Sequence, residues 1–149
     1  MIMLKENEKL LLPHLSKRLK HILIDKKRRN NERTRARKSM ALVEKRLAQW
    51  VAEGKYRERY CSMDVILEEL GLTRDELCSY CSRRFNKTFL SWRKELRMED
   101  ARKMLLDFPD VPVSKIASDL GIDDKSNFRH QFKSFTGYTP SEWREKFHK

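Results

Sequence analysis

Two short stretches of the sequence carry side chains that can bond the edges of DNA bases. In the major groove arginine can pair with guanine and asparagine with adenine, and serine can bond more than one base. Residues 125–133 contain Lys125, Ser126, Asn127, Arg129, His130 and Lys133. Residues 74–84 contain Arg74, Asp75, Cys78, Ser79, Ser82, Arg83 and Arg84, a less basic set that includes an aspartate. These residue types predict two DNA-reading helix faces; the alternative is two ordinary solvated faces.

A repeat with a period of about fifty residues indicates what would position these side chains. Ile66, Leu70 and Gly71 recur fifty positions later as Ile116, Leu120 and Gly121, and Leu77, Asn86 and Trp92 recur fifty-one positions later as Phe128, Gly137 and Trp143. A repeated unit of two helices and a turn predicts a duplicated helix-turn-helix, in which the second helix of each pair enters the major groove. The expected fold class is therefore all-α.

The first unit is predicted to span about residues 62–86. Ser62 can cap a helix that ends at Gly71, and residues 73–76 form a capping box for a second helix that runs to about Arg84. Asn86 is the usual substitute for glycine in a left-handed cap. The side chains expected inside are Met63, Ile66, Leu67, Leu70, Leu77, Phe85 and either Tyr80 or Cys81.

The second unit is predicted at about residues 113–137, followed by a final helix at about 140–147. Ser114 is expected to start its first helix, and Asp123 or Asp124 to cap the second helix after the turn at Gly121. Residues 139–142 combine a capping box with a first-turn proline, which is the strongest helix start in the sequence. The expected inward side chains are Ile116, Ala117, Leu120, Phe128, Phe132, Phe135, Trp143 and Phe147.

A long helix is predicted between the two units, from Thr88 to Asp107, and prolines 109 and 112 end it. Its expected buried stripe consists of Phe89, Trp92, Leu96, Ala101, Met104 and Leu105. At 1.5 Å per residue such a helix is roughly 30 Å long. One face of B-DNA presents its major groove again after ~34 Å. A rigid spacer of this length could therefore place two recognition helices in successive turns of one duplex.

The positive charge of the chain is concentrated in its first third. The net charge is +12, and residues 1–50 contain fifteen Lys/Arg and five Asp/Glu, whereas residues 51–149 contain nineteen and seventeen. DNA, RNA and anionic lipid are the natural partners of such a segment, and a solvated arm without a dedicated partner is the alternative. Residues 1–40 are interpreted as a basic arm, with the ordered domain beginning near residue 41.

Two parts of this arm differ in pattern. Residues 10–23 place Leu12, Leu15, Leu19, Ile22 and Leu23 at helical spacing, which predicts a short basic amphipathic helix with Pro13 as a candidate start. That helix could pair with a second copy of the chain, lie on a membrane surface, or continue an element outside this sequence. Residues 25–40 contain no large apolar side chain except Met40, so they form either a solvated helix or a disordered segment. A stripe of Leu42, Val43, Leu47, Trp50 and Val51 then predicts a helix that Gly54 ends.

Several runs of residues resemble one known family. The second unit contains I-A-x-x-L-G-I, N-F-x-x-x-F-K and G-Y-T-P-S-E-W-R, which closely match the signature of AraC/XylS-type transcriptional regulators. The first unit's L-x-x-L-G-L and the linker's W-R-K-E-L-R-x-x-x-A-R-K-M-L-L also fit, so the resemblance covers roughly residues 42–148. The turn of the second unit differs, because it has Ile122-Asp123-Asp124 where the family commonly shows Phe and serines.

This resemblance implies a bipartite, homeodomain-like DNA-binding domain that inserts two recognition helices into adjacent segments of the major groove. It also implies a bacterial regulator, often an activator, with RNA polymerase as a further partner. By motif position, the base-reading places fall on Lys125, Ser126, Asn127, Arg129 and His130 in the second unit, and on Arg74, Asp75, Cys78 and Ser79 in the first. Backbone contacts are expected from Arg83, Arg84 and Lys133.

Other chemistry has little support in the sequence. Cys78 and Cys81 have the spacing of a redox or zinc motif, but they lie in a predicted helix without a second ligand pair, which favours core packing or partial exposure. The four histidines, His14, His21, His130 and His148, form no ligand spacing. No enzyme activity, metal, cofactor or small-molecule effector site is predicted.

The sequence lacks a run long enough to span a bilayer and an evident secretory signal, and its three cysteines suit a reducing compartment. A cytoplasmic, nucleoid-associated protein is therefore expected. The main alternative function is a non-catalytic module that docks a protein or a membrane through the basic N-terminal helix. Because AraC-type domains commonly follow a sensor or membrane region, the chain is interpreted either as a stand-alone regulator or as the output end of something longer.

Overall fold

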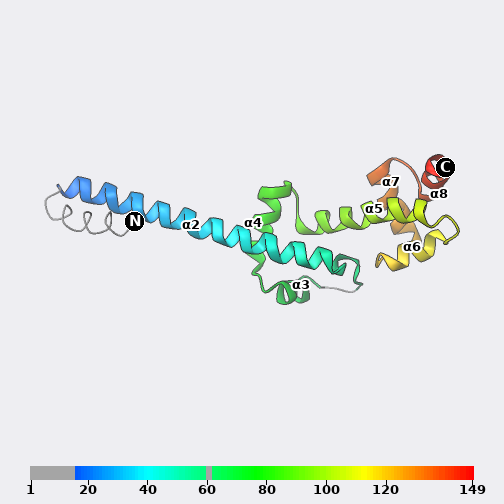
Figure 1. Cartoon of the computed structure of the whole chain (residues 1–149), viewed down its shortest axis with the longest axis horizontal. Coiled ribbons are helices and arrows are strands. Elements are labelled where there is room, and N and C mark those ends of the chain that lie inside the picture. Colours follow the sequence, from blue (N-terminus) through cyan, green and yellow to red (C-terminus); the bar gives the residue numbers. More distant parts are fainter. Residues whose placement is uncertain (1–15, 60–61) are drawn as a thin grey trace. The chain divides into compact units, whose positions relative to one another are not determined.

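The computed structural model describes residues 16–59 and 62–149, and within these ranges all regular elements are helices (Figure 1). The all-α fold class is therefore confirmed. The chain divides between Ala41 and Leu42 into an N-terminal unit and a C-terminal unit, which are described separately. The first and second helix-turn-helix units both lie in the C-terminal unit. Across the described residues, no helix combines the length and the apolar character that crossing a membrane requires.

The described part of the N-terminal unit is helical. Helix α2 spans Lys17–Ala52, so its first part belongs to this unit. The helix continues through residues 25–40, and all side chains from His21 to Lys38 are exposed. The helix predicted at residues 10–23 lies partly outside the described residues. From Lys17 onward it is helical, with Leu19, Ile22 and Leu23 exposed.

The last turns of α2 begin the C-terminal unit and contribute to its core. Val43, Leu47 and Trp50 are buried as expected, whereas Leu42 is exposed and Val51 is half-buried. The prediction that Leu42 packs inward is therefore wrong. Gly54 follows the helix with a φ of 70°, a left-handed conformation that allows the chain to leave the helix.

Helices α3 (Met63–Leu70) and α4 (Arg74–Phe85) form the first helix-turn-helix. The side chain of Ser62 caps α3, and both hydrogen bonds of the capping box at residues 73–76 are present at the start of α4. Asn86 ends α4 with a φ of 53°, as expected for an asparagine that replaces a C-cap glycine. The buried side chains here are Ile66, Leu70, Leu72, Leu77, Tyr80 and Cys81, while Met63, Leu67 and Phe85 are half-buried.

Helix α5 (Phe89–Asp107) packs against two separate groups of buried side chains. Its first turn contacts the end of α2, and its later turns belong to a second core that includes Ile116 and Phe132. Its buried side chains are Phe89, Arg93, Met98, Ala101 and Leu105, whereas Trp92, Leu96 and Met104 of the predicted stripe are only half-buried. The predicted stripe is thus confirmed at Phe89, Ala101 and Leu105 and wrong at its other three positions. At 3.6 residues per turn, the first two buried residues point to a side roughly a third of a turn away from the other three. Phe89 packs on Trp50, with ring centroids 5.6 Å apart, and Met98 packs into the second core.

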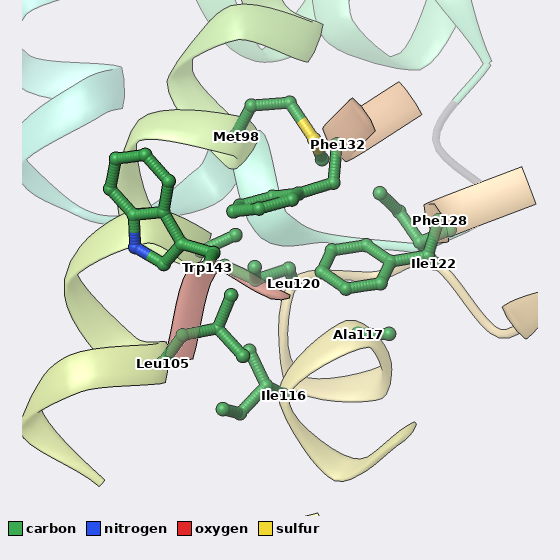
Figure 2. Close-up of a cluster of buried hydrophobic side chains, with 10 residues drawn as sticks. Met98, Leu105, Ile116, Ala117, Leu120, Ile122, Phe128, Phe132 and Trp143 are labelled. Carbon is green, nitrogen blue, oxygen red and sulfur yellow. The ribbon is translucent and has the colours of Figure 1, made fainter. Parts of the chain in front are cut away.

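The second core is formed by α5 with α6 (Val113–Asp119), α7 (Lys125–Thr136) and α8 (Pro140–Phe147). Figure 2 shows Phe132 of α7 near the centre of this cluster, between Met98 and Trp143. Phe135 was predicted to be buried, and this is wrong. It lies one turn beyond Phe132, in the last turn of α7, and is neither in the cluster nor packed against it. Phe147 is also exposed, although its ring centroid lies 4.2 Å from that of Trp143.

The capping geometry shows where the helices of the second helix-turn-helix unit begin. Asp124, rather than Asp123, caps α7, since its carboxylate accepts a hydrogen bond of 2.8 Å from the backbone N–H of Asn127. Helix α6 begins one residue before the predicted start, with Pro112 in the N-cap position. The capping box and first-turn proline predicted for α8 are both present.

A short segment after α2, residues 55–59, is bound along α5. It contains the 3₁₀ helix η2 (Lys55–Arg57). Arg93 and Arg97 of α5 each donate hydrogen bonds to the carbonyl oxygens of Tyr56 and Glu58, at distances of 2.7–3.2 Å. Asp100 accepts hydrogen bonds from the Tyr56 hydroxyl and, at 2.8 Å, from Arg57 Nε. Both carbonyls and side chains of the segment are thereby held on α5.

The same segment also contacts the turn of the second helix-turn-helix. Arg59 donates a hydrogen bond of 2.9 Å to the Ser118 carbonyl oxygen and forms an ion pair of 3.0 Å with Asp123. Gly121 has a φ of 78°, and a Cβ at this position would overlap the Arg57 carbonyl oxygen. The 55–59 segment therefore fixes the turn of the second unit against α5.

Candidate nucleic-acid interface

The predicted base-reading residues of the second unit lie on the solvent side of α7. Burial of Phe128 and Phe132 in the second core turns the rest of the helix outward, and the structure exposes Lys125, Ser126, Asn127, Arg129, His130 and Lys133. Gln131 donates a hydrogen bond of 2.8 Å to the Asn127 side-chain oxygen. The structure thus brings this predicted set together on one helix. Its contact with bases stays a prediction.

The acidic residues before α7 are engaged in structural interactions. The Asp124 carboxylate binds the helix N-terminus, and the Asp123 carboxylate pairs with Arg59. An ion pair of this kind offsets the charge that Asp123 would otherwise present to a phosphate. The charge on the exposed side of α7 is therefore set mainly by Lys125, Arg129 and Lys133.

The electrostatic effect of these cations is visible at the start of α8. The carboxylate of Glu142 accepts a hydrogen bond of 2.7 Å from the backbone N–H of Thr139. This bond is the main reason why the pKa of Glu142 lies below its usual value. Lys133 and Arg129 lower the pKa of Glu142 further, because a positive charge nearby favours the ionised carboxylate. Lys133 and Arg129 thus lie near enough to Glu142 to favour its ionised form.

Two of the α7 cations also line a hollow of ≈ 380 Å³ beside the first turns of α6, α7 and α8. Its lining includes Lys125, Arg129 and the small polar residues Ser114 and Ser141. Positive side chains and hydroxyl groups are the donors that proteins use to bond phosphate oxygens. This part of the interface is therefore chemically suited to the backbone of a duplex, next to the positions predicted to read bases.

The predicted contact residues of the first unit are exposed on α4. They are Arg74, Asp75, Cys78, Ser79, Arg83 and Arg84. Arg74 lies 3.4 Å from the Asp64 carboxylate, and Arg84 lies 2.9 Å from that of Glu44. At 3.6 residues per turn, Arg84 points away from the side centred on Cys78. The pairing with Glu44 is also the main cause that raises the pKa of Arg84, so Arg84 already has an anionic partner where a phosphate contact was predicted.

The two cysteines of α4 have different environments. Cys78 is exposed, whereas Cys81 is fully buried. Burial, and to a lesser degree the neighbouring Cys78, raises the pKa of the Cys81 thiol to about 11. Burial thus disfavours the thiolate, which is the form in which cysteine acts as a nucleophile. Within residues 16–59 and 62–149, no group of three or more His, Cys, Asp and Glu side chains is arranged to hold a metal ion.

The sequence did not reveal the arginines that hold together the elements of the candidate interface. Arg93 and Arg97 hold the 55–59 segment, and Arg144 of α8 donates to the carbonyl oxygens of Leu105 and Val111 at 3.1 and 2.8 Å. All three lie inside the family-like runs, but a charged residue in a helix pattern normally indicates a solvated position. Arg93 is instead only 8% exposed. Its partners lie more than thirty residues away in the sequence, so no local signal could have identified them.

Comparisons with known proteins agree with this geometry. The sequence profile of a helix-turn-helix domain family matches residues 66–146. The chain is 40% identical over 55 residues to the arabinose operon regulatory protein of Escherichia coli (strain K12), a match that covers 37% of this chain and 18% of that protein. It is 29% identical over 86 residues to an uncharacterized HTH-type transcriptional regulator of Pseudoalteromonas carrageenovora, covering 58% and 50%. The chain thus spans about a fifth of the length of the arabinose regulator that it matches.

Solved structures show the same fold. The C-terminal domain of the two-component response regulator yesN from Fusobacterium nucleatum superposes with a TM-score of 0.59 at 28% identity, covering 68% of this chain and 97% of that domain. The C-terminal domain of AraT, a response regulator from Geobacillus stearothermophilus, superposes with a TM-score of 0.59 at 20% identity, covering 76% and 86%. The second likeness, at this low identity, supports the fold alone.

Proposed function

Because this chain belongs to the AraC-type helix-turn-helix family of transcription regulators, we propose that it binds double-stranded DNA sequence-specifically and thereby regulates transcription. The observation that carries this proposal is the exposed side of α7. Six side chains that suit bases or phosphates lie there on a helix that is capped by Asp124 and anchored by Phe128 and Phe132. Such a helix has the shape and the polar face that major-groove recognition requires.

In this proposal α7 and α4 act as two recognition helices joined by α5. Lys125, Ser126, Asn127, Arg129 and His130 contact base edges from α7, and Arg74, Asp75, Cys78 and Ser79 do so from α4. Arg83 and Lys133 contact the phosphate backbone, whereas Arg84 must exchange Glu44 for a phosphate in order to do so. Helix α5 has nineteen residues, which is roughly 28 Å at 1.5 Å per residue. That length suits two helices that enter successive segments of the major groove.

The cognate site should be asymmetric, since the two recognition surfaces differ in charge and residue type. Activation through contact with RNA polymerase in the bacterial cytoplasm is the regulatory mode that we infer from the family. The side of α7 that carries the predicted contact residues supports DNA over a protein-docking function, because it concentrates arginine, asparagine, lysine and serine, whereas the exposed Phe135 lies on the same side of the helix as Phe128 and Phe132.

The proposal is tested by selecting bound sites from random double-stranded DNA and measuring affinity for the selected and a scrambled duplex. Arg129→Ala should weaken binding to the selected duplex by about 1–3 kcal/mol and relax the preference at one base pair. The matched control Lys133→Ala should weaken binding to both duplexes about equally, as expected for a phosphate contact. Equal losses for Arg129→Ala on both duplexes would reject its base-reading role. Failure to select any sequence would favour a protein-docking function instead.

A further inference from the structure

We propose that residues 17–41 of α2, here called the arm helix, bind the phosphate backbone of a DNA duplex without reading its sequence. This inference rests on the proposed function in naming DNA as the polyanion. It adds a third contact to the two recognition helices, on a segment that lies outside the matched helix-turn-helix region.

The charge of the arm helix is the first observation. Residues 17–41 contain eleven Lys/Arg residues and two acidic residues, Asp25 and Glu32. The ion pair between Arg28 and Glu32 has an N–O distance of 3.0 Å, and both side chains are more than half exposed. Such exposed pairs contribute little to stability. The arm helix therefore carries a large positive charge that its own acidic residues do not balance.

The helical conformation places these cations at a spacing that suits DNA. Twenty-five residues at 1.5 Å each are about 38 Å long, so there is on average one cation for every ~3.4 Å of helix axis. B-DNA carries one negative charge for every ~1.7 Å of its axis. Like charges along the arm helix repel one another, and a polyanion bound alongside them removes this repulsion. Binding also releases the counterions that are condensed on the polyanion. The arm helix thus fits an extended, highly charged partner better than a small anion.

The apolar residues of the arm helix argue against a membrane surface or a second copy of this chain. The exposed large apolar side chains are confined to its first turns, at Leu19, Ile22, Leu23 and Ile24. Between Asp25 and Ser39 there is no large apolar residue at all. A membrane-surface helix needs an apolar face along its length, and a coiled coil needs several apolar heptads. The middle of the arm helix offers neither.

The residue types favour phosphate as the bonded group. Five of the cations between residues 28 and 37 are arginines, whose planar guanidinium groups can bond two phosphate oxygens at once. Four of them, Arg29, Arg33, Arg35 and Arg37, are exposed; at 3.6 residues per turn Arg29, Arg33 and Arg37 lie on one side of the helix, and Arg35, Lys27 and Lys38 lie toward the opposite side, so cations surround the helix. No single base-reading side is built, and the expected binding is therefore independent of sequence.

The test measures the affinity of the whole chain for a random-sequence 40-base-pair duplex over a series of KCl concentrations. In one variant Arg29, Arg33, Arg35 and Arg37 are replaced by glutamine, which has a similar helix propensity. In the control variant the same four residues are replaced by lysine, which keeps the charge. The slope of log K against log salt should become shallower by about 0.9 for each lost phosphate contact in the glutamine variant, and stay unchanged in the lysine variant.

A change in slope of less than one contact, about 0.9, in the glutamine variant would overturn the proposal. Equal changes in both variants would also overturn it, since they would show that charge is not what matters. An unchanged DNA slope, together with loss of binding to phosphatidylserine vesicles, would assign the arm helix to a membrane instead. Because the duplex has a random sequence, this result is independent of the base preference by which the proposed function is judged.

Discussion

Replacing Gly121 by alanine should destabilise the protein more than the same replacement at Gly137. Both glycines lie in the second unit with left-handed conformations, at φ values of 78° and 84°. A Cβ at position 137 meets no atom within 4 Å. A Cβ at position 121 would overlap the Arg57 carbonyl oxygen and lie 3.2 Å from its carbonyl carbon. The pair of variants therefore separates the cost of the backbone conformation from the cost of the close approach.

The expected magnitudes follow from these two terms. A left-handed conformation costs a non-glycine residue about 1–2 kcal/mol, and alanine recovers about 0.4–1 kcal/mol by restricting the unfolded chain. These terms are shared, so Gly137→Ala should cost about 1 kcal/mol. Gly121→Ala adds an overpacking term of about 1–3 kcal/mol. The Arg57 carbonyl cannot easily rotate away, because Arg93 and Arg97 hold the carbonyls on either side of it.

Urea unfolding of both variants, followed by circular dichroism, gives the two free energies of unfolding. The difference between them should be about 1–3 kcal/mol, with similar m-values. Equal destabilisation of the two variants would refute the reasoning, because it would mean that the 55–59 segment moves aside at little cost. In that case the segment could not fix the turn of the second unit against α5.

Three further predictions concern the caps, the arm and the first unit. The folded-state pKa of Glu142 is lowered, so its stabilising effect is present above its ordinary pKa of 4.5 and is lost as the pH falls through the lower value. Glu142→Gln should therefore reduce the urea midpoint at pH 7 and reduce it progressively less as the pH falls below 4.5, and a reduction that does not change with pH would contradict the stabilising role of the ionised carboxylate. Deletion of residues 1–38 should leave a single cooperative thermal transition, because the side chains from His21 to Lys38 are exposed; loss of that transition would show that the domain needs the arm. With Cys61 replaced by serine, maleimide should label the exposed Cys78 but not the buried Cys81, and a selected duplex should slow this labelling. Unchanged labelling in the complex would remove α4 from the interface.

Much of the local structure could be predicted from the sequence because helix ends depend on residues close together in the chain. The capping boxes at residues 73–76 and 139–142, the cap at Ser62 and the left-handed Asn86 are all found as expected. Each involves groups within about four residues of one another. The outward side of α7 could be predicted for the same reason, since the helical period alone separates Arg129 from Phe128 and Phe132.

The tertiary structure alone decided which side of α5 is buried and what holds the candidate interface in place. One hydrophobic period cannot describe a helix that packs on two cores. The burial of Met98 and Arg93 was therefore not predicted, and the burial of Trp92 and Leu96 was predicted to be greater than it is. Phe135 has the right spacing but lies where the second core has already ended. The pairing of Arg84 with Glu44, and of Arg93 with Tyr56 and Glu58, joins residues 35 to 40 positions apart. Whether a charged side chain is solvated or buried depends on such distant partners, and no local pattern contains them.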